Sequence, residues 1–160
     1  MVDTSAMPET DRNTSNTETT GTTAITGHTA ITGHTAITGH AGSAGTTDPD
    51  CLFCRIVAGE IPAEIVATSD HSVAFRDINP QAPVHVLVVP TRHIIDAASV
   101  KVSDAEEVAD LLVVARQVAA ENGIAESGYR LVMNVGRDAQ NSVGHLHLHV
   151  LGGRPMGHLA

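Results

Sequence analysis

The segment 145-HLHLHVL-151 alternates imidazole and aliphatic side chains. Successive side chains of a β-strand point to opposite faces, so this alternation predicts a strand with three histidines on one face and aliphatic residues toward a core. Alternate residues lie about 6.6 Å apart along a strand, which separates His145 from His149 by about 13 Å. One metal ion could bind adjacent members but hardly all three, so we expect the histidines to serve two different sites.

The sequence around this segment predicts an α+β domain with an antiparallel sheet. A long helix over 104–122 is expected to begin at the N-cap Ser103, with Glu106 completing a capping box and Gly123 ending it. A short helix over 50–58 should turn Leu52, Phe53 and Ile56 inward. The other predicted elements are strands over 65–68, 71–76, 84–89, 129–135 and 145–151, a proline-rich loop over 79–83, and a loop over 136–144 that joins the last two strands as in a hairpin.

Residues 1–49 differ sharply in composition from the rest of the chain. They are rich in Ser and Thr, and the hexapeptide TAITGH occurs three times over 23–40. Such a polar, low-complexity tail is expected to be disordered, because it buries too little apolar surface to offset its ordering entropy. A weak metal-collecting tract or a β-solenoid fragment are the alternatives. The folded domain is then residues 50–160.

Composition excludes several functions. With 9 basic and 18 acidic residues the formal net charge is −9, which argues against non-specific nucleic-acid binding and against a polybasic membrane anchor. No apolar run approaches the roughly 20 residues of a membrane span, and no signal peptide is recognisable. We therefore expect a cytoplasmic protein, in which Cys51 and Cys54 are metal ligands or thiols rather than a disulfide. The Cys-x-x-Cys spacing alone leaves redox, metal-binding and accidental interpretations open.

Taken together, these motifs resemble the histidine triad (HIT) family of nucleotide-binding proteins. HLHLHVL fits the family signature His-x-His-x-His-x-x with apolar x, and 75-FRDI-78, 80-PQAP-83 and 151-LGGR-154 match its context. The resemblance covers about residues 50–156 and is closer to the Hint (purine nucleoside phosphoramidase) branch than to the dinucleoside polyphosphate hydrolase (Fhit) branch. It implies a HIT-like fold, with an antiparallel sheet, one long helix and a short N-terminal helix, and a homodimer.

The resemblance also implies catalytic roles. His147 would attack the α-phosphorus of a nucleotide to form a nucleotidyl-histidine, which water then hydrolyses. His149 would donate to a non-bridging phosphate oxygen, where developing charge needs a donor. His85 would orient or buffer the nucleophile, and the Ser142 hydroxyl would reach the leaving group.

A nucleotide site is implied by further positions. The Asp77 carboxylate can accept hydrogen bonds from both ribose hydroxyls. Asn134 corresponds to a contact with the ribose–phosphate region, and the backbone around Val143 and Gly144 offers N–H groups to phosphate. The base would lie among the apolar residues Phe53, Ile61, Phe75 and Ile78.

A structural zinc ion is implied as well. Bacterial HIT proteins with such a cysteine pair bind zinc, and the ligands here would be Cys51, Cys54, His93 and His145. Four protein ligands close the coordination sphere, which makes such a site structural. His145 would then serve the metal, while His147 and His149 serve the phosphate.

The function indicated is hydrolysis of nucleoside 5'-phosphoramidates or of acyl- or sulfo-adenylates, with AMP or an adenylate conjugate as the bound purine nucleotide. The alternatives are a dinucleoside polyphosphate hydrolase, a non-catalytic AMP-binding sensor or scaffold, and a metallohydrolase in which zinc activates water through His145 and His147.

Overall fold

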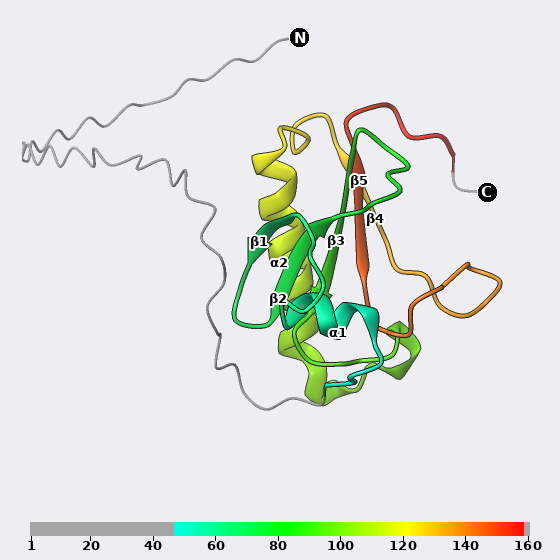
Figure 1. Cartoon of the computed structure of the whole chain (residues 1–160). Coiled ribbons are helices and arrows are strands. Elements are labelled where there is room, and N and C mark those ends of the chain that lie inside the picture. The colour runs from blue at the N-terminus through cyan, green and yellow to red at the C-terminus, as the bar shows by residue number, and fades with distance from the viewer. Residues whose placement is uncertain (1–46, 159–160) are drawn as a thin grey trace, which may run out of the picture. The chain divides into compact units, whose positions relative to one another are not determined.

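An antiparallel five-stranded sheet in the order β1-β2-β3-β5-β4 forms the centre of the computed structural model, which describes residues 47–158 (Figure 1). The predicted tail over 1–49 therefore lies almost wholly outside the described residues. The elements are α1 (Leu52–Val57), β1 (Ile65–Thr68), β2 (Ser72–Arg76), β3 (Val84–Pro90), two short 3₁₀ turns η1 (Ala97–Ser99) and η2 (Val102–Asp104), α2 (Ala105–Glu121), β4 (Tyr129–Val132) and β5 (Leu148–Gly152).

Both faces of the central strand β3 are covered, and this explains its nearly continuous apolar sequence. Val84, Val86 and Val88 point to one face, where they pack with the inner side of α2. Leu87 and Val89 point to the other face, where they pack with the α1 region. Every residue of β3 is buried, as expected for a strand between two packed layers. The expected α+β class is confirmed.

The boundaries of two predicted strands are wrong. β5 begins at Leu148 rather than at residue 145. The last residue pair between β3 and β5 is Val88↔Leu148. The same register would place Leu146 opposite Pro90, and the strand does not extend that far because proline has no N–H to donate to the ladder. The other strand, β4, ends at Val132 rather than at residue 135. It does pair with β5 in the antiparallel sense predicted.

The start of the long helix also differs from the prediction. Ser103 lies inside η2, and α2 begins only at Ala105 with Asp104 as its N-cap. The Ser103–Glu106 capping box is therefore wrong: the Asp104 carboxylate instead accepts from the backbone N–H of Lys101 at 2.8 Å and from Arg92 at 2.6 Å. The inward position expected for Leu52 is wrong too, because this side chain is exposed.

Within residues 47–158, none of the helices is long and apolar enough to cross a membrane.

Candidate active site and metal centre

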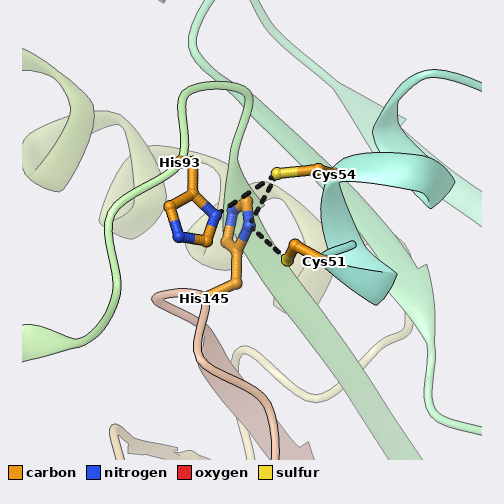
Figure 2. Close-up of side chains that lie close together, drawn as sticks. All are labelled: Cys51, Cys54, His93 and His145. Atoms are coloured by element: carbon orange, nitrogen blue, oxygen red, sulfur yellow. Dashed lines mark hydrogen bonds between the residues drawn. The ribbon is translucent and has the colours of Figure 1, made fainter. Parts of the chain in front are cut away.

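Two cysteines and two histidines converge where α1 meets the loops that follow β3 and precede β5 (Figure 2). Cys51 immediately precedes α1 and Cys54 lies in its first turn. The Nδ1 atom of His145 is 3.4 Å from the Cys51 sulfur and 3.5 Å from the Cys54 sulfur. The Nδ1 atom of His93 is 3.3 Å from the Cys54 sulfur. The structure thus brings together the four side chains that the resemblance implied.

These four residues fit a tetrahedral zinc ion. Zn–S bonds near 2.3 Å and Zn–N bonds near 2.0–2.1 Å at tetrahedral angles give a sulfur–nitrogen separation of about 3.6 Å, close to the separations above. Thiolates and imidazoles are ligands that zinc prefers. The Nε2 atom of His145 lies 3.0 Å from the Pro90 carbonyl oxygen, so its N–H donates there and Nδ1 keeps the lone pair that a metal needs.

The protonation of this cluster agrees with metal binding. Burial lowers the pKa of His145 to about 4; the neighbouring His93 and His147 also lower it, whereas the hydrogen bond to the Pro90 carbonyl raises it. This imidazole is therefore uncharged near pH 7, as a metal ligand must be. Burial also raises the pKa of the Cys54 thiol. A thiolate at this position therefore requires a positive charge beside it, which a dication bound there would supply.

The central histidine of the triad, His147, is held through one of its two ring nitrogens. The Nδ1 atom of His147 is 2.7 Å from the backbone carbonyl oxygen of His145. A carbonyl can only accept, so Nδ1 carries the proton and Nε2 carries the lone pair. The ring is buried and packs edge-to-face on Phe53, with ring centroids 5.4 Å apart. This tautomer leaves Nε2 as the available nucleophile.

A separate series of hydrogen bonds orients His149, the last histidine of the triad. The backbone N–H of Gln81 donates to Nδ1 of His85 at 3.1 Å, so the proton of His85 is on Nε2. This N–H faces Nδ1 of His149 at 2.9 Å, which in turn places the proton of His149 on Nε2. That atom is buried and has no partner among the described residues. His149 therefore presents one neutral donor.

Asp77, His85 and His149 also lie close enough together to suggest a second metal site. The hydrogen bond from Gln81 argues against it. A metal on Nε2 of His85 would need a lone pair on that atom. The lone pair of the neutral ring is on Nδ1, which accepts the hydrogen bond from Gln81, and neutral imidazole has only one such nitrogen. The Asp77 carboxylate lies 3.4 Å from Nε2 of His85, and it accepts a hydrogen bond from the backbone N–H of Asn79 at 2.8 Å.

Burial sets the protonation of this cluster. It lowers the pKa of His85, and the carboxylate of Asp77 opposes that shift. Burial, together with the neighbouring His147 and His85, lowers the pKa of His149 to about 4, again against Asp77. Near pH 7 the donor at His149 is therefore an uncharged imidazole.

The residues predicted to bind the nucleotide or its leaving group differ in burial. Phe53 and Phe75 are buried in edge contact, 5.5 Å between centroids, within the core on the α1 face. Ile78 is fully exposed next to Asp77, and Ile61 is half-buried. Asn134 and Val143 are half-buried, whereas Ser142 and Gly144 are exposed in the loop before the triad.

The sequence prediction missed the backbone groups that orient the histidines. The N–H of Gln81 and the carbonyls of Pro90 and His145 carry no signal in a sequence, because every residue type offers them. The Arg154 guanidinium, in the 151-LGGR-154 motif, donates to the Gln81 carbonyl at 3.0 Å. A hollow of about 770 Å³ near Ile124 and Met156 contains none of the histidines.

The chain belongs to the HIT domain family. The family model matches residues 58–156. A purine nucleoside phosphoramidase of Escherichia coli is 43% identical over 108 residues, which cover 68% of this chain and 91% of that protein. A HIT-like protein of Azospirillum brasilense is 45% identical over 115 residues, or 71% of this chain and 94% of that protein.

Solved structures of HIT proteins are also similar to this chain. A HIT family hydrolase from Clostridium thermocellum has a TM-score of 0.69 and 43% identity, and the match covers 71% of this chain and 98% of that one. A histidine triad protein from Clostridium difficile has a TM-score of 0.69 and 36% identity, with 72% and 100% covered.

Proposed function

We propose that this protein is a nucleotide hydrolase that cleaves purine nucleoside 5'-phosphoramidates, or acyl- or sulfo-adenylates, at the α-phosphorus. The observation that carries the proposal is the hydrogen bond from Nδ1 of His147 to the His145 carbonyl, which leaves Nε2 with its lone pair. The similarity to a protein named purine nucleoside phosphoramidase supports the same substrate class.

In the first step, Nε2 of His147 forms a bond to phosphorus while the bond from phosphorus to the leaving nitrogen or oxygen breaks. The leaving group takes a proton, and the exposed hydroxyl of Ser142 is suited to pass one from solvent. In the second step, water attacks phosphorus and loses a proton to solvent, the N–P bond breaks, and the electron pair of that bond returns to Nε2. The products are the nucleoside monophosphate and a regenerated neutral imidazole.

His149 supplies the electrostatic part of this mechanism. Its Nε2–H has no protein partner among the described residues, so it can donate to a non-bridging phosphate oxygen as negative charge develops there. The donors from Gln81 and His85 hold it in this tautomer before substrate arrives. Preorganised donors of this kind need no reorientation during the reaction.

Nucleotide binding would use Asp77 for the ribose hydroxyls, Asn134 for the ribose–phosphate region, and the backbone at Val143 and Gly144 for phosphate. The exposed side chain of Ile78 beside Asp77 is available to cover the base. Because Phe53 and Phe75 are buried, we assign them to shaping the floor of the site.

A structural zinc ion, a homodimer and a cytoplasmic location belong to the same proposal. Zinc would hold the Cys51 end of α1 against the loops that carry His93 and His145. β4 lies at the edge of the sheet, and its Leu131 is exposed, so an isologous dimer through this edge would bury unpaired backbone groups. Cys51 and Cys54 are not joined in a disulfide, which suits a reducing compartment.

The experiment compares wild-type protein with His147→Ala, and uses the exposed His158→Ala as a matched control. We expect wild type and the control to hydrolyse an adenosine 5'-phosphoramidate, and His147→Ala to bind AMP without turnover. A preference for a dinucleoside polyphosphate by kcat/KM would favour the Fhit-like alternative. AMP binding without any turnover by wild type would favour a sensor. Loss of bound metal together with activity in His147→Ala would favour a metallohydrolase, in which His147 is itself a metal ligand.

A further inference from the structure

One peptide group connects the metal centre to the nucleophile. It is the planar unit formed by the carbonyl of His145 and the N–H of Leu146. The carbonyl accepts from Nδ1 of His147 at 2.7 Å, and the N–H donates to the carbonyl of Ile94 at 2.5 Å. Because a peptide group is planar and rigid, fixing one end of it fixes the direction of the other.

Each end of this peptide group is one step along the chain from a residue that the proposed zinc ion would bind. His145 precedes the group in the chain, and its imidazole faces both cysteine sulfurs. Ile94, which holds the N–H, directly follows His93, whose imidazole faces Cys54. A metal ion bound to these imidazoles would fix the loop after β3 and the segment before β5 relative to each other.

We infer that the metal centre is a positioning device for catalysis, which sets the tautomer and direction of His147 through the main chain of His145. The expected change in kcat rests on the proposed function, whereas the expected tautomer of His147 does not. The coupling needs no movement of α2 or of the sheet, since the two ligands flank the peptide group itself. Metal loading therefore changes the rate of attack more than it changes nucleotide binding.

A second restraint on His147 that involves the metal centre comes from Phe53. Phe53 touches both the ring of His145 and that of His147, with centroids 5.9 and 5.4 Å apart. An edge-to-face contact limits the space around the ring but does not select which nitrogen is protonated. The hydrogen bond to the His145 carbonyl does select it, so the tautomer of His147 is the direct reporter of the coupling.

The test uses full-length protein labelled with ¹⁵N-histidine, as wild type, as Cys51→Ser, and as Leu52→Ser. Leu52 lies between the two cysteines and is exposed, so its variant is a matched control on the same helix. Zinc is removed from wild type with a chelator and then restored, and circular dichroism verifies that each sample is folded. Bound zinc, the His147 ring-nitrogen resonances, and kcat and KM for an adenosine 5'-phosphoramidate are measured on the same samples.

With zinc bound, we expect His147 to show a single Nδ1–H tautomer. Without it, in stripped wild type and in Cys51→Ser, we expect a mixture of tautomers and a fall in kcat on the order of ten- to a hundredfold, as for a displaced reacting group, while KM changes by less than about threefold. Zinc should restore wild type, and Leu52→Ser should match it throughout.

A folded, zinc-free protein that keeps the single tautomer would overturn the inference, as would one that keeps its kcat. If zinc-loaded wild type turns over no phosphoramidate, the proposed function fails, and the tautomer alone then decides the coupling.

Discussion

Lowering the pH from 7 to 5 should destabilise the protein through His149, and His149→Gln should remove that part of the effect. Burial lowers the pKa of this imidazole from 6.5 to about 4 in the folded state. Between these values the unfolded chain binds a proton at His149 and the folded protein does not, so stability falls as the pH falls. Linkage with these two pKa values gives a loss of about 2 kcal/mol between pH 7 and pH 5.

Urea unfolding at both pH values measures this quantity. The fall in unfolding free energy should be about 2 kcal/mol larger for wild type than for His149→Gln, and any loss of zinc at the lower pH is common to both proteins. An NMR titration of His149 gives the pKa directly. Equal pH dependence of the two proteins, or a measured pKa near 6.5, would refute the assigned burial of this residue.

Three substitutions test other parts of the structure. Phe53→Ala removes the ring that packs on His147 and should reduce the unfolding free energy in urea by about 3–5 kcal/mol; a loss below about 1 kcal/mol would contradict this packing. Gly152→Ala would bring a methyl group within 2.7 Å of Cδ1 of Ile124 and should cost about 1–3 kcal/mol, and adding Ile124→Val should recover part of that cost. No recovery in the double variant would show that this contact is not the cause. Asp77→Asn should raise KM for the phosphoramidate by roughly tenfold, because a charged acceptor for the ribose is lost, and an unchanged KM would remove Asp77 from the nucleotide site.

The sequence predicts the sheet well because burial on two faces leaves a strong signal. β3 is apolar throughout except for His85 and Pro90, and Leu148 and Val150 of β5 are buried as the alternation predicted. The start of β5 could not be predicted in this way. It depends on which residue stands opposite Pro90, and that requires the register of two strands far apart in the chain.

In the candidate site, too, the sequence predicts some features and not others. Spacing alone indicated that three alternating histidines serve two sites, and the structure separates His145, among the cysteines, from His149, beside His85. His93 entered the metal set only through the family resemblance, because nothing in its local sequence marks it as a ligand. The tautomers depend on the N–H of Gln81 and the carbonyl of His145, which are main-chain groups that only a folded structure can bring into contact.

The central claim is that Nε2 of His147 forms a bond to phosphorus during turnover. The most direct measurement is peptide mapping by mass spectrometry after rapid quenching of wild-type protein with an adenylated substrate, under conditions that preserve N–P bonds. We predict an adenylyl group on the peptide that contains residues 145–151, assigned by fragmentation to His147 and absent from His147→Ala. Steady turnover with an unmodified peptide, or with the group on His149, would contradict the account.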